Sequence, residues 1–235
     1  CDPNPDARAG FGDTTFVSAD ELFAWGAVDA VYIASPHEFH AGHAVMAAKA
    51  GKHVLVEKPV AVTLAEAAAM VGAAEAAGTV LMVGPSHGYD PPVTLAAELV
   101  ASGEAGPVRL IHAFNFTDFL YRPRRPAELD TAQGGGVILS QATHQIDMVR
   151  RIVASPVASV RAWAGGWDAR AAEGAFTALL TFGNGAAANL TYSGYARYDS
   201  DALAGWVGEL GGVKDPAAHG RAGAALAAAD EQNAK

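Results

Sequence analysis

The sequence predicts an α/β protein in which a doubly wound parallel sheet is followed by an α+β domain with a mostly antiparallel open sheet. Up to about residue 90, short apolar runs alternate with helical segments, a pattern typical of βαβ units. Further on, longer strand patterns flank a Gly-Asn-Gly turn, which favours an antiparallel hairpin. We therefore expect one domain over 1–90, a second over 91–213 and a peripheral tail over 214–235.

Composition narrows the class of protein. At 235 residues the chain is long enough for two domains, and no run of 18 apolar residues predicts a membrane helix. A net charge of -9 argues against nucleic acid, whose phosphates bind clustered Lys and Arg. The single cysteine, Cys1, fits a reducing cytoplasm. Because the chain opens without Met on what reads as a strand end, we expect it to be truncated, and we expect the same of its other end.

The elements of the first half follow from apolar runs and capping residues. Buried-type strands are expected at 30–34, 54–56 and 80–83, and the continuous apolar run of the second predicts a strand covered on both faces. Helices are expected at 18–25, 39–50 and 63–77. Capping boxes at Ser18 with Glu21 and at Thr63 with Glu66 open two of them, and Gly51 and Gly78 are suitable helix stops.

The second half has longer predicted strands and a different order of elements. We expect helices at 92–102 and 137–154, strands at 108–117, 157–164, 176–182 and 187–192, and a loop rich in Pro, Arg and Gly at 118–136. Gly183-Asn184-Gly185 predicts the turn between the last two strands. In the helix at 137–154, the 3.6-residue period puts Ser140, His144 and Asp147 on one polar stripe. The same period predicts an apolar face of Ile138, Ala142, Ile146, Val149 and Val153.

Glu57 and Lys58 directly follow the strand at 54–56, and Pro59 ends it. In open α/β sheets the ligand crevice lies outside the carboxyl ends of the strands, so Lys58 is placed for chemistry. The alternative is a solvated lysine, which is the commoner situation.

Three motifs carry a family resemblance. They are Ser35-Pro36 followed by His40, the run 50–59 that ends in Glu57-Lys58-Pro59, and the glycine triplet 134–136 that leads to His144 and Asp147. Together they resemble the Gfo/Idh/MocA family of NAD(P)-dependent oxidoreductases, from Cys1 to about Tyr195. Segments 116–126 and 130–133 resemble its phthalate 4,5-cis-dihydrodiol dehydrogenase branch.

The resemblance implies an incomplete Rossmann-type sheet that binds NAD, and the family's glycine-rich first turn is absent from this chain. The implied cofactor-binding residues are Asp2, Ser35, Pro36, His40, Glu57 and Lys58. Asp2 matches the acid that accepts hydrogen bonds from the ribose hydroxyls, which favours NAD over NADP. The alternatives are an ordinary loop aspartate at Asp2 and a simple turn at Ser35-Pro36.

The resemblance also implies two catalytic residues. Lys58 matches the lysine beside the nicotinamide, and a cation there can polarise a substrate oxygen. His144 matches the histidine of the second-domain helix and is the candidate general base. Ser140 stands where many members carry an acid, which puts the proton relay of sugar dehydrogenases in doubt.

Arg122, Arg124 and Arg125 lie in a proline-stiffened loop ahead of the glycine triplet. Arginine binds carboxylates through two parallel hydrogen bonds, so this loop suits an anionic substrate. A solvated basic loop or a subunit contact is the alternative. The candidate substrate-binding residues are His87, Tyr89, Arg122, Arg124, Arg125, Ser140 and His144. No pair of residues has strong metal-ligand spacing, so we predict no metal.

The sequence therefore predicts an NAD-dependent dehydrogenase that oxidises a carbinol carbon of a carboxylated aromatic cis-dihydrodiol. A sugar or polyol dehydrogenase of the same family is the alternative within enzymes, and a non-catalytic NAD-binding sensor is the alternative outside them. We expect a small anionic substrate and neither nucleic acid nor membrane as partner. An open sheet with an uncovered face predicts a homo-oligomer, either a dimer or a tetramer.

Overall fold

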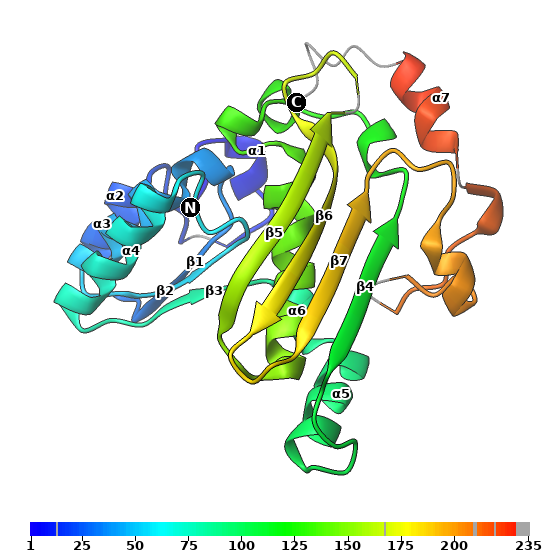
Figure 1. Ribbon diagram of the computed structural model, residues 1–235. Helices are drawn as coiled ribbons and strands as arrows, with labels where there is room; N and C mark the ends of the chain where they lie inside the picture. Colours follow the sequence, from blue (N-terminus) through cyan, green and yellow to red (C-terminus); the bar gives the residue numbers. More distant parts are fainter. Residues whose placement is uncertain (13, 167, 209–210, 219, 229–235) are drawn as a thin grey trace. The chain divides into compact units, whose positions relative to one another are not determined.

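The computed structural model describes residues 1–12, 14–166, 168–208, 211–218 and 220–228. The chain forms two compact units, Cys1–Gly84 and Pro85–Lys235, each described by itself below (Figure 1). The expected boundary near residue 90 stays a prediction, as does the peripheral tail. Part of that tail, residues 219 and 229–235, lies outside the described residues.

The first unit contains the parallel sheet that the sequence predicts. Its elements are α1 (Pro5–Arg8), α2 (Ala19–Trp25), β1 (Ala30–Ile33), the 3₁₀ helix η1 (His37–Phe39), α3 (His40–Lys49), β2 (His53–Val56), α4 (Leu64–Ala77) and β3 (Leu81–Val83). The strand order is β1-β2-β3, and both pairings are parallel. Helices α3 and α4 lie side by side along this sheet (Figure 1). The predicted strands and helices of this half are confirmed.

The helix ends follow the residues that predicted them. Thr63 accepts a hydrogen bond from the Glu66 amide, and the Glu66 carboxylate accepts one from the Thr63 amide, so the predicted capping box is present. Gly78 closes α4 at φ +66°, a left-handed conformation that glycine adopts without steric cost. Ser18 caps α2 by accepting from the Glu21 amide.

The prediction that β2 is covered on both faces is wrong. Val54 and Val56 are buried, whereas Leu55 between them is 37% exposed. Its cross-strand neighbours Tyr32 and Met82 are also exposed, so one face of the sheet is open. A short apolar run does not distinguish a strand that is buried on one face from a strand buried on both.

The second unit is built on a four-stranded sheet. Its elements are the 3₁₀ helix η2 (Ser86–Tyr89), α5 (Pro91–Ala101), β4 (Leu110–Phe116), the 3₁₀ helices η3 (Phe119–Tyr121), η4 (Pro126–Leu129) and η5 (Thr131–Gln133), the π-helix η6 (Ile138–Ala142), α6 (Thr143–Val153), β5 (Val157–Gly166), β6 (Glu173–Phe182), β7 (Ala187–Ser193), the 3₁₀ helices η7 (Ser200–Ala204) and η8 (Pro216–Ala218), and α7 (Arg221–Ala228). The order is β4-β7-β6-β5. Strand β6 is antiparallel to both neighbours, while β4 and β7 are parallel. The mostly antiparallel sheet is therefore confirmed.

The predicted hairpin turn between β6 and β7 is also confirmed. Gly185 has φ +84°, and its amide donates to the Phe182 carbonyl at 3.0 Å. The Asn184 side chain accepts from the Ala186 amide at 3.1 Å, which fixes the turn from within.

The helix predicted at 137–154 begins with a π-helical turn and has a buried face different from the predicted one. Ala142, Val149 and Val153 are buried as predicted, but Ile138 and Ile146 are exposed, while His144 and Gln145 are buried. The side-chain Nε2 of Gln145 donates to the Thr191 carbonyl of β7 at 3.2 Å, so this side chain faces the sheet. Gln145 thus lies on the buried side of the helix, and its neighbour Ile146 lies on the exposed side.

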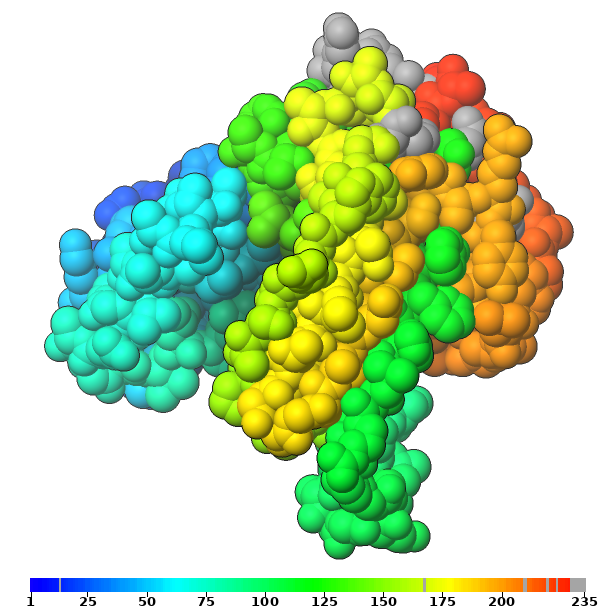
Figure 2. All heavy atoms as spheres, viewed as in Figure 1, coloured from blue at the N-terminus to red at the C-terminus, as the bar shows by residue number. Residues whose placement is uncertain are grey.

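One face of the four-stranded sheet packs against α6, and the other is open. The buried cluster includes Val149, Val153, Leu180, Leu190 and Tyr192. Exposed apolar side chains on the strands are Leu110, Phe114, Val160, Trp163 and Leu179. Figure 2 shows the strands β5, β6, β7 and β4 without a covering helix in that view. Within the described residues, no helix has the length and apolarity needed to cross a membrane.

Gly135 offers a test of the packing ahead of η6. A Cβ added there would lie 2.5 Å from the backbone carbonyl of Glu128, which cannot swing away as a side chain could. We expect Gly135→Ala to destabilise the protein by about 1–3 kcal/mol, measured as a lower Tm in thermal unfolding. The matched control is Gly166→Ala, where nothing lies within 4 Å. Equal stability of the two variants would contradict this packing.

Candidate active site

Lys58 follows β2 at the carboxyl edge of the first unit's sheet and is half-buried. Beside it, the Glu57 carboxylate accepts hydrogen bonds from the Tyr32 hydroxyl at 2.5 Å and from the Lys58 amide at 3.1 Å. The hydrogen bond to Glu57 raises the pKa of Tyr32, and burial and the Glu57 charge act in the same direction. The Glu57 carboxylate is thus fixed by its own chain, and its predicted contact with a cofactor stays a prediction.

His40 ties together the turns that follow β1 and β2. Its ring is almost fully buried, with Nδ1 2.8 Å from the Pro59 carbonyl oxygen and Nε2 2.8 Å from the Ser35 carbonyl oxygen. Sequence reasoning placed His40 among the cofactor contacts. In the structure its ring nitrogens face backbone carbonyls, so the observed role is to hold the Lys58-Pro59 turn beside the Ser35-Pro36 turn.

Ser35 and Pro36 begin the turn into η1. The Ser35 hydroxyl lies 3.1 Å from His43 Nδ1. Burial lowers the pKa of His43, the nearby His40 acts in the same direction, and Asp20 opposes them. His43 is a useful comparison for His40, because its ring is hydrogen-bonded to the Ser35 side chain rather than to a backbone carbonyl.

The first unit's residues fit a dinucleotide. Oxygen Oδ1 of the Asp2 carboxylate accepts the Asn4 amide at 2.8 Å, and among the described residues Oδ2 accepts no hydrogen bond. A partly exposed carboxylate oxygen is a suitable acceptor for ribose hydroxyls. Lys58, Ser35 and Pro36 lie at the carboxyl ends of parallel strands, where open α/β sheets bind ligands.

In the second unit, the structure brings His87 of η2 onto His144 of α6. Their ring centroids lie 4.0 Å apart in an edge-to-face arrangement at 75°, and both rings are buried. His87 Nδ1 is 3.5 Å from the Asp90 carboxylate. Asp147 comes one turn after His144, and its Oδ2 is buried with no hydrogen bond among the described residues. Two predicted site residues thus meet in one cluster that also holds two carboxylates.

The remaining predicted residues near this cluster have local partners. The Tyr89 ring lies under the Arg151 guanidinium, 4.0 Å from centroid to Cζ. The Ser140 hydroxyl donates to the Gly136 carbonyl at 2.6 Å and so stabilises the start of the helix. The glycine triplet permits close approach, but to the chain itself: a Cβ at Gly136 would overlap the Glu173 carboxylate.

The arginine loop divides into two kinds of side chain. The guanidinium of Arg124 lies 3.7 Å from the Phe119 ring centroid and pairs with Glu128 at 3.4 Å. Burial lowers the pKa of Arg124, and the Glu128 charge opposes this. Arg125 also pairs with Glu128, at 3.4 Å. Arg122, in contrast, is 56% exposed, and its nearest carboxylate, Asp118, is 3.9 Å away.

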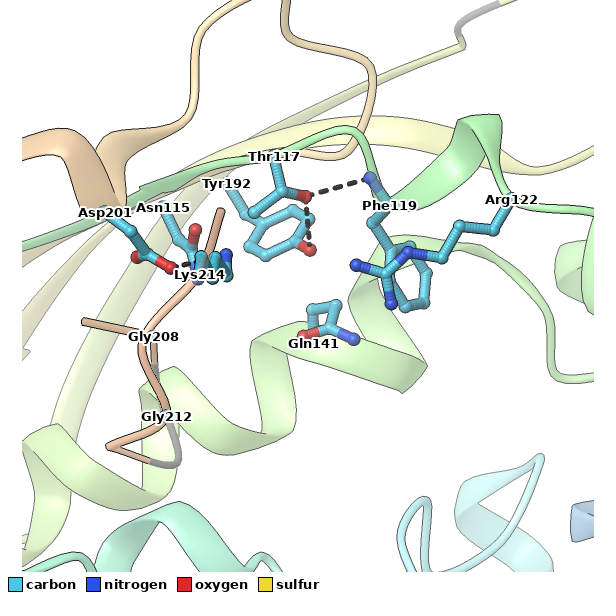
Figure 3. Close-up of a pocket in the computed structure, with 10 residues that line it drawn as sticks. All are labelled: Asn115, Thr117, Phe119, Arg122, Gln141, Tyr192, Asp201, Gly208, Gly212 and Lys214. Carbon is cyan, nitrogen blue, oxygen red and sulfur yellow. Dashed lines mark hydrogen bonds and ion pairs between the residues drawn. The ribbon is translucent and has the colours of Figure 1, made fainter. Parts of the chain in front are cut away.

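Arg122 lines a pocket of about 320 Å³ that lies within the second unit (Figure 3). The lining residues are Asn115, Thr117, Phe119, Arg122, Gln141, Tyr192, Asp201, Gly208, Gly212 and Lys214. The Thr117 and Tyr192 hydroxyls are 3.1 Å apart, and Thr117 also accepts the Phe119 amide at 3.1 Å. The pocket therefore has a cation at one wall and a row of hydroxyl and amide groups behind it.

Lys214 forms the opposite wall together with Asp201. Its Nζ is 3.2 Å from Asp199 Oδ2 and also pairs closely with Asp201 Oδ2. Partial burial acts to lower the pKa of Lys214, but hydrogen bonds to Asp201 and Asp199 outweigh it and raise the pKa. Sequence reasoning missed this wall, because it placed Lys214 at the start of a peripheral tail.

Sequence reasoning also missed Asn115, Thr117, Gln141 and Tyr192. The alternation of polar Asn115 and Thr117 along β4 was the available signal, since both side chains are buried polar groups on one face. His144 does not line this pocket, whereas Gln141, three residues earlier, does. Among the described residues, no group of three or more His, Cys, Asp or Glu side chains could hold a metal ion.

Comparison with known proteins decides the family. Residues 3–85 match the family described as an oxidoreductase family with an NAD-binding Rossmann fold, and residues 93–214 match the Gfo/Idh/MocA C-terminal domain. The chain belongs to the Gfo/Idh/MocA oxidoreductase family. The family resemblance, the fold class and the NAD-binding Rossmann domain are therefore confirmed.

Individual relatives of this Gfo/Idh/MocA protein agree. It is 56% identical over 185 residues to 1-carboxy-3-chloro-3,4-dihydroxycyclohexa-1,5-diene dehydrogenase of Comamonas testosteroni, covering 78% of this chain and 47% of that protein. A putative dehydrogenase from Bordetella bronchiseptica RB50 has a similar structure, with a TM-score of 0.93 and 44% identity over 99% of this chain and 62% of that one. The WlbA dehydrogenase from Bordetella pertussis, solved with NADH and UDP-GlcNAcA, has a TM-score of 0.73 at 28% identity over 85% of this chain and 59% of that one. The chain spans about half the length of the curated relatives it matches.

The contacts of the His40 ring with the Ser35 and Pro59 carbonyl oxygens can be tested directly. We expect His40→Ala to speed hydrogen exchange of the backbone amides of Glu57, Lys58 and Val60 by about tenfold, the loss expected for a buried hydrogen bond. His43→Ala, one turn along the same helix, should leave these amides unchanged because its hydrogen bond is with the Ser35 hydroxyl rather than with the Pro59 carbonyl. Equal protection of the Glu57, Lys58 and Val60 amides in both variants would contradict this role of His40.

Proposed function

We propose that this protein is an NAD-dependent dehydrogenase that oxidises a carbinol carbon of a carboxylated aromatic cis-dihydrodiol. The observation that carries the proposal is Arg122 at the wall of a polar pocket in the second unit, with hydroxyl and amide groups behind it. A guanidinium there suits a carboxylate, and the hydroxyls suit a diol. The Comamonas testosteroni relative supports this substrate class, since its name combines a carboxyl group with two ring hydroxyls.

The proposed cofactor is NAD rather than NADP. Asp2 accepts hydrogen bonds from the ribose hydroxyls, and its negative charge disfavours a 2′-phosphate. When bound, NAD supplies the hydride acceptor for the carbinol carbon.

The chain's own residues handle the oxygen and its proton. Lys58 donates to the substrate hydroxyl and stabilises negative charge that develops on its oxygen. His144, one helical turn after the pocket residue Gln141, is the proposed acceptor of the hydroxyl proton as the carbon–oxygen double bond forms. Loss of hydride from carbon and proton from oxygen leaves a ring ketone, which tautomerises to a catechol. The gain of aromaticity favours this direction.

The test is formation of NADH with a phthalate cis-dihydrodiol as substrate. We expect turnover by the protein and a loss of about 100-fold or more in kcat for Lys58→Ala. The matched control is Lys52→Ala. Lys52 precedes the same strand, and its Nζ donates to the Gly26 carbonyl. Full turnover by Lys58→Ala would contradict the role of Lys58. Turnover only on inositol or glucose would indicate a polyol dehydrogenase, and NAD binding without any turnover would indicate a sensor.

We also propose a homo-oligomer in the cytoplasm. Leu110, Phe114, Val160, Trp163 and Leu179 are exposed on the second unit's strands, and an uncovered apolar sheet face is a typical subunit interface. The single cysteine fits a reducing compartment. Sedimentation should give a dimer or tetramer, and Trp163→Lys should shift it toward monomer. A monomer at high concentration of the unaltered protein would contradict this assembly.

A further inference from the structure

We propose that the pocket of the second unit binds the two ends of its ligand at two separate subsites, called poles below. Arg122 binds a carboxylate at one pole, and the Asp201–Lys214 pair binds adjacent hydroxyl groups at the other. The identity of the ligand as a dihydrodiol rests on the proposed function. The preference for a small hydroxylated carboxylate rests on the pocket alone.

The carboxylate pole is Arg122 because the neighbouring arginines are engaged. Arg124 and Arg125 share the carboxylate of Glu128, and neither lines the pocket. Among the described residues Arg122 pairs with Asp118 alone, at 3.9 Å, which is at the edge of ion-pair distance, and its side chain is 56% exposed. A ligand carboxylate that forms two parallel hydrogen bonds outcompetes such a distant partner.

The second pole is unsuited to an anion. Two aspartates, Asp199 and Asp201, surround one lysine, so this cluster carries a net negative charge. Lys214 has three N–H donors, of which two are directed to these aspartates. A hydroxyl group both donates and accepts, so one of two adjacent hydroxyls can donate to Asp201 while the other accepts from Lys214 and keeps its own proton for transfer. The charge difference between the poles therefore fixes the direction in which the ligand lies.

The wall between the poles is rigid and polar. Asn115, Thr117 and Tyr192 are each more than nine-tenths buried, and Thr117 and Tyr192 are hydrogen-bonded to each other. Ser200 donates to Asn115 and accepts the Phe116 amide, so the segment that carries Asp201 is anchored to β4. Figure 3 shows Asp201 and Lys214 on one side of Tyr192 and Arg122 on the other.

The size of the pocket suits a single ring. Its volume of about 320 Å³ is at the lower end for small-molecule sites, which range from roughly 300 to 1,000 Å³. The Phe119 ring lines the pocket next to Arg122 and offers an apolar surface for a carbon ring. A six-membered ring with a carboxylate at one end and two hydroxyls at the other matches this arrangement.

The test measures binding by calorimetry with the whole protein, so it does not depend on turnover. The probes are benzoate, which has the carboxylate without hydroxyls, cis-1,2-cyclohexanediol, which has the hydroxyls without the carboxylate, and a phthalate cis-dihydrodiol. We expect Arg122→Gln to weaken benzoate and the dihydrodiol by about tenfold and to leave the diol unchanged. Asp201→Asn should weaken the diol and the dihydrodiol and leave benzoate unchanged.

Controls separate a local effect from a loss of folding. Arg109→Gln removes an exposed arginine outside the pocket and should bind all three probes normally. Thermal unfolding of each variant reports on folding. Methyl benzoate against the unaltered protein removes the ligand charge without any substitution, and it should bind about as weakly as benzoate binds to Arg122→Gln.

The outcomes distinguish this inference from the proposed function. If each variant weakens all probes equally, or if neither weakens any, the two-pole reading is wrong even when the dihydrodiol is turned over. If the predicted pattern appears without turnover of the dihydrodiol, the two-pole pocket stands and the proposed function falls.

Discussion

The register between β4 and β7 is the constraint on which the second unit's pocket depends. Asn115 pairs with Tyr192 in this parallel ladder, and the Thr117 amide continues it by donating to Ser193. A slip of one residue would turn each of these side chains to the opposite face of the sheet. Because the polar groups of the pocket come from strands, their positions are fixed by the backbone hydrogen bonds of the ladder.

The same logic applies to the first unit, where the parallel sheet carries its candidate site residues on the turns after its strands. Lys58 and Ser35 stand at the carboxyl ends of β2 and β1, and His40 joins those turns through two carbonyl oxygens. A buried histidine thus lies between the two turns that carry these candidate residues.

The sequence predicts the fold well because its signals are local. Capping at Thr63, the glycine stops and the turn at Asn184 involve residues a few positions apart, and the structure confirms them. The site is less predictable, because its partners are distant in sequence. Which arginine is available depends on Glu128, the buried side of α6 depends on the hydrogen bond from Gln145 to β7, and the wall at Lys214 depends on Asp199.

The measurement that tests the central claim most directly follows the hydride. A phthalate cis-dihydrodiol carrying deuterium at its carbinol carbons would be incubated with the protein and NAD, and the nicotinamide product would be analysed by mass spectrometry. The account predicts one deuterium in each reduced nicotinamide and an equal amount of catechol. Reduced nicotinamide without deuterium, or catechol without reduced nicotinamide, would contradict it.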